Sequence, residues 1–172
     1  YPRSGDQLLA TMATADGTEA VDWIISDQMT ARNDAKFRFY AKSYDGDNTY
    51  HPWAYLTVLV STTDNAVSSF TPLSGFTSVQ VPHKNNNDSQ TSWTEFDVDL
   101  SAYAGQKIYI AVRNNTPSNG FVTFFDDFYF ENFEYVNSDN SAPYFTTIPE
   151  TTATVGKKWT YNYSVADPDG DP

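Results

Sequence analysis

Cysteine is absent from this chain of 172 residues, and its absence removes whole classes of chemistry. Without thiols, disulfides, thiolate zinc sites and cysteine nucleophiles are all excluded. Histidine is scarce as well, and neither His51 nor His83 stands at a spacing typical of metal ligands. The sequence also lacks a Ser-His-Asp hydrolase pattern and a glycine-rich phosphate loop, so we expect no catalytic function.

Long apolar runs are missing too, and basic residues are few. No stretch is apolar for long enough to span a bilayer, so we expect no membrane insertion. Ten basic residues stand against 22 acidic ones, which gives a formal net charge of -12 at pH 7. Such a chain repels nucleic acid, so no nucleic-acid partner is expected. Its excess carboxylates suit an extracellular protein and Ca²⁺, which prefers oxygen ligands.

An initiator Met and a signal peptide are lacking at Tyr1, so we interpret the chain as a piece of a longer protein. The composition favours an all-β fold, because aromatic residues make up 16% of the chain and strand-forming Tyr, Phe, Thr and Val dominate. DQLLATMATA near the N-terminus is predicted as a strand.

Several further segments alternate apolar and polar residues with the period of two that is typical of half-buried strands. Turn residues separate them, which predicts a β-sandwich or a barrel. The residues expected to face the core are Phe37, Phe39 and Ala41; Leu56, Val58 and Val60; Phe96, Val98 and Leu100; and Ile108, Ile110 and Val112.

The segment FVTFFDDFYFENF, residues 121–133, places two adjacent aspartates inside a highly aromatic strand pattern. In a regular strand one face would carry Val122, Phe124, Asp126, Phe128 and Phe130. That face is otherwise apolar, so we expect it to meet the core with Asp126 pointing inward. A buried carboxylate needs compensation, for which Ca²⁺, a basic partner such as Arg113, or backbone N–H donors are the alternatives.

Composition changes after Tyr135, where VNSDNSAP has the character of a linker. We therefore predict a first domain at 1–136, a linker at 137–142 and the beginning of a second β-domain at 143–172. Two short strands are marginal alone, so this last segment, if ordered, is expected to pair with a sheet edge of the first domain or of another copy.

Five segments together resemble the cleaved-adhesin or choice-of-anchor J family, MAM-like jelly-roll modules of secreted and surface proteins in Bacteroidetes and their relatives. These segments are DWIIS (22–26), FRFYAKSYD (37–45), YLTVLVSTT (55–63), SWTEFDVDLSAYAGQKIYIAVRNN (92–115) and FFDDFYF (124–130). The resemblance implies a two-sheet antiparallel jelly roll, export, adhesion or carbohydrate binding without catalysis, and often a structural Ca²⁺. The tail, 142–171, resembles the opening of an Ig- or cadherin-like repeat.

Asp126 and Asp127 match the paired aspartates of the family's strand, and we predict a structural Ca²⁺ at this pair. Ca²⁺ takes six to eight oxygen ligands. Because first and last strands are often neighbours in jelly rolls, Asp16, Glu19 and Asp22 are predicted to supply more of them. A hydrogen-bonded structural aspartate without metal is the alternative.

Two other acidic stretches are weaker metal candidates. Asp45 and Asp47 begin a run like that of an EF-hand loop, but the later Gly and Glu are missing, so an ordinary polar turn is the alternative. The run DPDGD, residues 167–171, resembles the calcium-ligating stretches between cadherin-like repeats.

Aromatic and polar residues around one expected loop form a candidate glycan site. Aromatic rings stack on sugar rings while polar neighbours bind the hydroxyl groups. The residues predicted to act in this way are Tyr44, Asn48, Tyr50, His51 and Trp53. The alternative is that Trp53 packs against a sheet end and the tyrosines cover the core. The tryptophans at 23 and 93 are expected in the core.

The function expected from these features is that of a non-catalytic binding module of a secreted or cell-surface protein. We predict that it recognises polysaccharide or glycan and is stabilised by Ca²⁺. Adhesion to a surface protein and a role as a structural spacer are the alternatives. Exposed coplanar aromatic residues favour the first function, and a broad apolar patch favours protein adhesion.

Overall fold

The computed structural model is built almost entirely of β-strands. It describes residues 2–14, 18, 21–44, 53–82, 93–118, 120, 122–135, 144–147, 155–156, 158, 160 and 164–166. The strands are β1 (Leu9–Met12), β2 (Trp23–Ile25), β3 (Met29–Tyr44), β4 (Ala54–Ser61), β5 (Thr71–Pro72), β6 (Val79–Val81), β7 (Thr94–Asp99), β8 (Lys107–Asn114), β9 (Val122–Tyr135), β10 (Tyr144–Phe145) and β11 (Val165–Ala166).

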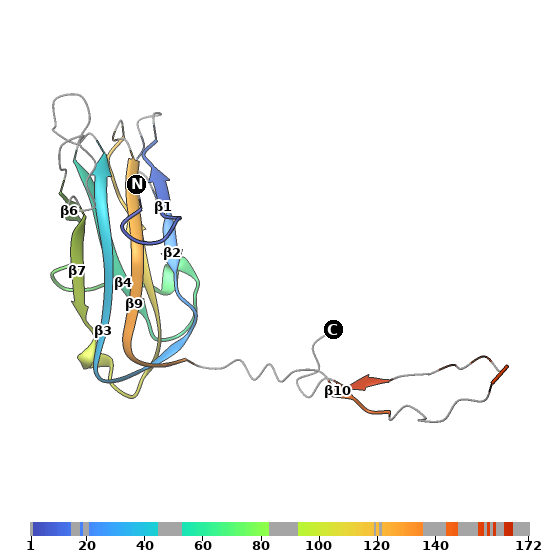
Figure 1. The fold of residues 1–172 in the computed structure, drawn as a ribbon. Coiled ribbons are helices and arrows are strands. Elements are labelled where there is room, and N and C mark those ends of the chain that lie inside the picture. Colours follow the sequence, from blue (N-terminus) through green and yellow to red (C-terminus); the bar gives the residue numbers. More distant parts are fainter. Residues whose placement is uncertain are drawn as a thin grey trace. The chain divides into compact units, whose positions relative to one another are not determined.

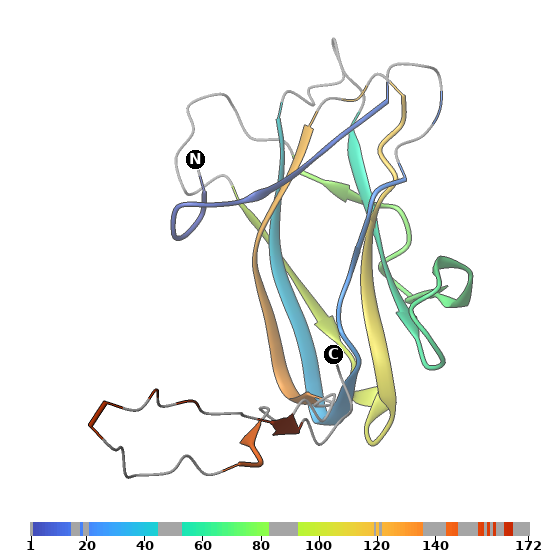
Figure 2. The same ribbon diagram turned by 90° about the vertical axis from the view of Figure 1, so that its right-hand side faces the viewer.

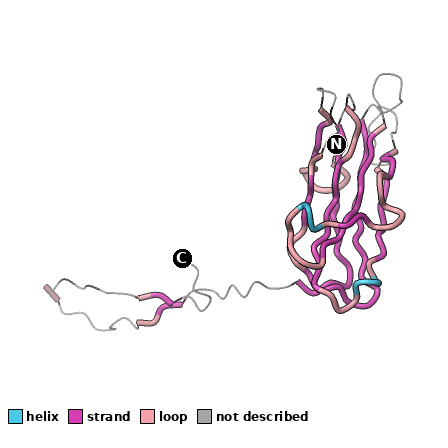
Figure 3. Tube along the Cα trace, turned by 180° about the vertical axis from the view of Figure 1, so that it is seen from behind, coloured by secondary structure: helices cyan, strands magenta, loops and turns pink. Residues whose placement is uncertain are grey.

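The described helices are two short 3-10 segments, η1 (Val67–Ser69) and η3 (Ser101–Tyr103), drawn in cyan in Figure 3. No helix in the described part of the chain is long and apolar enough to cross a membrane. The chain divides into two compact units, Tyr1–Val136 and Asn137–Pro172. In the second unit, β10 and β11 form an antiparallel pair of two residues each.

The first unit is an antiparallel β-sandwich (Figures 1 and 2). Sheet A has the strand order β1-β9-β3-β7, and sheet B places β2 beside β8, β8 beside β4, and both β5 and β6 along β4. Pairing of Met29 with Ile108 and of Thr30 with Lys107 joins the two sheets at one end. This confirms the predicted all-β sandwich.

The core lies between the sheets and confirms the four predicted alternating faces, because all twelve residues expected there are buried. Its aromatic rings stack at distances typical of favourable pairs. The ring centroids of Phe39 and Phe96 are 5.0 Å apart, and those of Phe37 and Phe130 are also 5.0 Å apart. The predicted N-terminal strand is confirmed as β1.

Strand β9 departs from the predicted alternation, and the expectation that Asp126 faces the core is wrong. Phe125 is fully buried against Phe39, whereas Phe124 lies beside Lys42 on the outer side. The register against β3 shifts between Arg38 and Tyr40, and Asp127 has a φ of 49°. An extra residue of this kind is a β-bulge, which reverses the faces of all residues that follow it.

Past this bulge, Phe128 and Phe130 pack against the core, as predicted for them. A second positive φ, 58° at Asn132, shifts the alternation once more, and Phe133 rather than Asn132 packs inward. Side chains of Asn and Asp tolerate this left-handed conformation better than most residues. The two shifts, at Asp127 and Asn132, divide β9 into three parts. In each part the alternation is set so that aromatic residues face the core.

The outer face of sheet B carries a second, smaller apolar cluster. Leu59 and Ala111 point away from the main core and are buried beneath Phe70, which lies in the segment after β4. Trp23 joins this cluster, with its ring centroid 5.8 Å from that of Phe70. Trp23 therefore packs against an apolar cluster, as expected, but its position on β2 directs it to the cluster on the outer side of sheet B.

Candidate functional site

The strand pairing brings four chain connections to one end of the sandwich. Met12 and Tyr44 both pair with Val122, so β1 and β3 end where β9 begins. The pairs Trp23–Arg113, Ala54–Val81, Leu56–Asn114 and Ala41–Thr94 place the remaining strand ends at the same end. We call this the loop-bearing end, and the connections that it joins are 13–22, 45–53, 82–93 and 115–121 (Figure 1).

A buried polar network forms the base of the loop-bearing end. The Asn114 amide donates to Thr11 Oγ1 at 2.8 Å and its carbonyl oxygen accepts from the Thr116 hydroxyl at 2.6 Å. The Thr57 hydroxyl donates to the Asn115 side-chain oxygen at 2.9 Å. Asn114 and Thr116 are each only 2% exposed. The Asn114–Thr11 bond joins β8 of sheet B to β1 of sheet A, and the other two bonds hold the chain that follows β8, so the network fixes these strand ends.

Two of the predicted glycan residues, Tyr44 and Trp53, lie in the described part of the chain, where strands end or begin at this end of the sandwich. Trp53 immediately precedes β4 and is half-buried. Tyr44 is the last residue of β3. Asn48, Tyr50 and His51 belong to the connection between those two strands and lie outside the described residues. The glycan site therefore stays a prediction.

The predicted metal ligands divide between two places. Asp22 directly precedes β2, and its carbonyl oxygen accepts the Asn114 N–H at 2.9 Å at the loop-bearing end. Asp16, Glu19, Asp45 and Asp47 belong to connections at that same end and lie outside the described residues, as does 167–171. Asp126 and Asp127 instead lie at the bulge of β9, on the outer face of sheet A.

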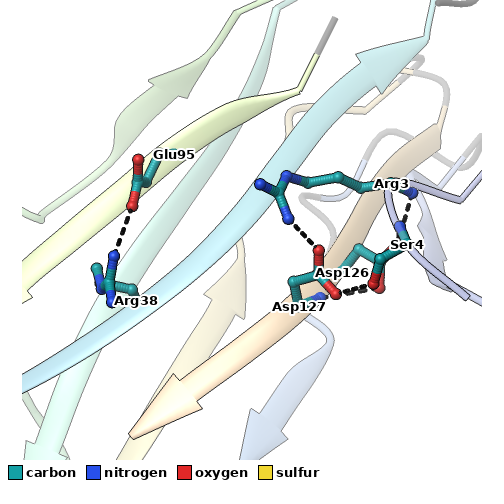
Figure 4. Close-up of polar contacts among 6 residues, drawn as sticks. All are labelled: Arg3, Ser4, Arg38, Glu95, Asp126 and Asp127. Atoms are coloured by element: carbon teal, nitrogen blue, oxygen red, sulfur yellow. Dashed lines mark hydrogen bonds and ion pairs between the residues drawn. The ribbon is translucent and has the colours of Figure 1, made fainter. Parts of the chain in front are cut away.

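The N-terminal segment binds the paired aspartates (Figure 4). Asp126 accepts the backbone N–H of Arg3 at 2.7 Å, that of Ser4 at 3.4 Å and that of Asp127 at 2.8 Å. Asp127 accepts the Arg3 guanidinium and the Ser4 hydroxyl. The Arg3 guanidinium carbon also lies 3.5 Å from the ring centre of Tyr40, a cation–π contact. We call these contacts the N-terminal clamp.

The clamp favours the charged forms of its two ionic groups. Burial alone would raise the pKa of Asp127, whose side chain is only 9% exposed, but hydrogen bonds from Ser4 and Arg3 outweigh it and hold the pKa below its ordinary value. The hydrogen bond to Asp127 in turn raises the pKa of Arg3. The pair thus gains its stability as an ion pair.

The negative charges of Asp126 and Asp127 are therefore compensated in two of the three predicted ways, by backbone N–H donors and by a basic side chain. Backbone N–H groups serve Asp126, and a basic side chain serves Asp127. That side chain is Arg3; Arg113 lies on β8 with its guanidinium carbon 5.9 Å from the ring centre of Trp23. Within the described residues, no group of three or more Asp, Glu or His side chains gathers as a metal site.

Cations of β3 line the centre of the outer face of sheet A, between acidic residues of β7 and β9. Arg38 on β3 contacts Glu95 on β7 at 3.3 Å and also pairs with Glu131 on β9. Lys36 contacts Asp97 at 3.5 Å. The alternation of β3 predicts this charged outer face, but nothing in the sequence indicates which acids flank it, because the strand order is a tertiary property.

Lys42 continues this row of cations and is only 6% exposed. Its ammonium group lies 4.6 Å from the ring centre of Trp93 and 5.6 Å from that of Phe124. Trp93 is buried, as expected, but it packs against Lys42 on the outer face of sheet A and not between the two sheets. Because side chains alternate along β7 and Phe96 faces the core, residue 93 falls on the outer side. This alternation in the sequence could have identified the position of Trp93.

Comparisons with known proteins point to one family. The model of the Cleaved Adhesin Domain family matches residues 3–129. The K1 cleaved adhesin domain of Lys-gingipain (Kgp) from Porphyromonas gingivalis W83 shares 21% identity at a TM-score of 0.55, over 72% of this chain and 73% of that chain. The K2 domain of Lys-gingipain shares 22% identity at a TM-score of 0.53, over 74% and 73%. These structures have the same fold. No curated protein matches the chain.

Proposed function

Because the chain belongs to the Cleaved Adhesin Domain family, we propose that it is a non-catalytic adhesive module of a secreted or cell-surface protein. We further propose that its ligand is a polysaccharide or glycan, bound at the loop-bearing end. The observation that supports this location is that the ends of the strands joined by four connections lie at one end of the sandwich (Figure 1). Connections on a rigid scaffold are where binding residues concentrate in proteins.

The chemistry of this end suits a sugar. The connection between β3 and β4 contributes Tyr50, His51 and Trp53 together with amide and carboxylate side chains. Aromatic faces stack against the CH groups of sugar rings, and the polar side chains bind hydroxyl groups. The buried network around Asn114 supports the proposal, because a fixed base reduces the cost of ordering the binding residues.

Calcium is part of this proposal. Asp16, Glu19 and Asp22 stand in or beside one connection of the loop-bearing end, and Asp45 and Asp47 stand in another. Carboxylates from two connections that meet at one end can share a hard cation, which would hold the connections in a binding conformation. The N-terminal clamp already compensates the paired aspartates of β9, so we assign the proposed ion to the loop-bearing end.

A binding screen tests both parts of the proposal. The chain is assayed against a polysaccharide and glycan panel in Ca²⁺ and then in EDTA. We expect at least one glycan to bind in Ca²⁺, and Trp53→Ala to weaken that binding about tenfold, since loss of one stacking partner removes about 1.4 kcal/mol. Tyr129→Ala is the matched control, because Tyr129 is an exposed aromatic residue on the outer face of sheet A.

The outcomes separate the possible functions. Binding that is equal in Ca²⁺ and EDTA would remove calcium and keep the glycan site. Equal losses in the Trp53 and Tyr129 variants would move the site away from the loop-bearing end. Absence of binding to every member of a broad panel would reject glycan recognition. Protein adhesion or a spacer role would then remain as the function of the module.

A further inference from the structure

An apolar cleft lies between the two sheets, on the side of the sandwich that carries β2 and the second half of β9. Its volume is about 310 Å³, within the range of ligand sites in proteins. Ile24, Ile110 and Val112 line it from sheet B, and Phe37, Phe128 and Phe130 line it from sheet A. The crossing from β2 to β3 closes one end with Ser26, Asp27 and Met29, and Tyr135 stands beside them.

The cleft exists because sheet A is incomplete on this side. Strand β1 pairs with β9 only from Val122 to Phe125. From Phe128 onward β9 pairs with β3 on one side, and no strand of the described chain pairs with the other. The aromatic side chains that β9 directs inward past the bulge are therefore reached from the open side. Phe128 and Phe130 are accordingly only partly buried, unlike Phe39 in the middle of the core.

A strand edge of sheet B borders the same cleft. In the described chain β2 pairs only with β8. The Asn114 N–H bonds to the Asp22 carbonyl, and the Ser26 N–H bonds to the Ile110 carbonyl, each at 2.9 Å. In an antiparallel strand the backbone groups of every second residue bond to the same neighbouring strand. The backbone groups of Ile24 therefore point toward β8, like those of Asp22 and Ser26. The N–H and C=O of Ile25 point the other way, to the open edge.

The edge of β2 is therefore prepared to pair with one more strand. A segment added there would extend sheet B, and every second side chain would lie on the same side as Ile24, which faces the cleft. An edge whose outward backbone groups have no partner strand in the described chain, next to an apolar space, supplies both components of strand addition. Main-chain hydrogen bonds give affinity, and the cleft selects alternate apolar side chains.

The negative charge of this chain indicates that the added segment is basic. Asp27 lies at the closed end of the cleft, directly after the β2 edge, and forms no ion pair within the described residues. The chain as a whole has a formal net charge of -12. An acidic surface of this strength attracts basic partners and speeds their association.

We propose that this cleft and the edge of β2 form a second binding site, which takes an extended basic polypeptide segment of a partner protein. The segment adds as a strand beside β2, places alternate apolar side chains against Phe128 and Phe130, and sets a Lys or Arg against Asp27. This site lies along the side of the sandwich and does not depend on the proposed glycan site at the loop-bearing end.

Two variant pairs test the site without disturbing the glycan proposal. Ile25→Pro removes the outward N–H while leaving the β2–β8 bonds in place, because proline is tolerated on a strand edge whose N–H faces away from the sheet. Ile25→Ala is its control, since it loses the same side chain but keeps the N–H. Asp27→Asn removes the charge at the cleft, and Asp6→Asn removes an exposed charge from the N-terminal segment.

The probe is a phage-displayed library of random decapeptides, selected on the 172-residue chain and then measured as synthetic peptides. We expect selected peptides to alternate apolar residues and to contain Lys or Arg. Their affinity should fall at least about tenfold in Ile25→Pro relative to Ile25→Ala, and about threefold in Asp27→Asn relative to Asp6→Asn at low salt. Amide shifts in NMR spectra should be largest at 23–27 and 128–135.

Two results would overturn the proposal. One is selection that enriches no peptide above an empty support. The other is a set of enriched peptides that bind Ile25→Pro and Ile25→Ala equally or perturb the loop-bearing end instead of β2. Circular dichroism melts of all four variants confirm that any loss of binding comes from a folded chain.

Discussion

The outer faces of the two sheets are made compatible with water in different ways. Sheet A turns charged residues outward and pairs them, with the cations of β3 between acids of β7 and β9. Sheet B turns apolar residues outward and covers them with the segment that carries Phe70. An apolar face needs a cover because exposed apolar area is unfavourable, whereas paired charges remain compatible with water. Disrupting sheet B should therefore cost far more stability than disrupting sheet A.

The largest effect is expected at the cover of sheet B. Phe70→Ala leaves Leu59, Ala111 and the Trp23 ring without their partner, and we expect it to lower the free energy of unfolding by about 3 kcal/mol. Val67→Ala in the same segment is the control, because Val67 is 54% exposed and its truncation should cost no more than about 0.5 kcal/mol. Urea denaturation measures both; similar losses would show that Phe70 does not hold the cover in place.

A smaller effect is expected at the N-terminal clamp on sheet A. Asp127→Asn keeps the shape of the side chain but removes its charge from Arg3, and we expect the melting temperature at pH 7 to fall by about 3 °C. The folded pKa of Asp127 is below its ordinary value of 3.8, so its contribution is complete above that value and is lost as pH falls through the folded pKa.

Melts from pH 7 to pH 2 check this dependence. The difference between the original chain and Asp127→Asn should close as the solution becomes more acidic than about pH 4. Asp6→Asn is the control, and its melting temperature should match that of the original chain at every pH. A difference that persists at pH 2 would mean that the introduced amide disturbs packing and that the charge is not the cause.

The smallest effect is expected in the exposed part of the charged face. Lys36 and Asp97 lie 3.5 Å apart, and their side chains are 44% and 48% exposed. A double-mutant cycle of Lys36→Gln and Asp97→Asn should give a coupling worth about 1 °C or less in melting temperature. Added salt at about 0.5 M should abolish it. A coupling as large as the loss in Phe70→Ala would contradict the distinction between the two faces.

Strand β3 shows how far alternation alone predicts the fold. Phe37, Phe39 and Ala41 face the core as expected, because the period of two is a property of any extended chain and needs no knowledge of its neighbours. Strand β9 shows where the same reasoning fails. Its bulge at Asp127 depends on pairing with β3, so residues that look continuous in sequence occupy opposite faces.

The candidate sites also divide into features that residue types predict and features that depend on tertiary contacts. The sequence identifies Trp53 and the aromatic residues around it as candidates, because stacking chemistry belongs to the side chains themselves. It does not identify Arg3 as the partner of Asp127, since the two residues are 124 positions apart and no local pattern joins them. Nor does it indicate the cleft, which arises where β1 ends and β9 continues.

The sequence alone determined an all-β architecture, the inward faces of its regular strands, a strongly acidic character and the exclusion of thiol chemistry. Each of these depends on residue type or on periodicity within a few positions. The tertiary structure alone decided the faces of β9, the donors to its paired aspartates, the gathering of four connections at one end and the open edge of β2. Each of these depends on which strands become neighbours, and that is set by contacts between residues far apart along the chain.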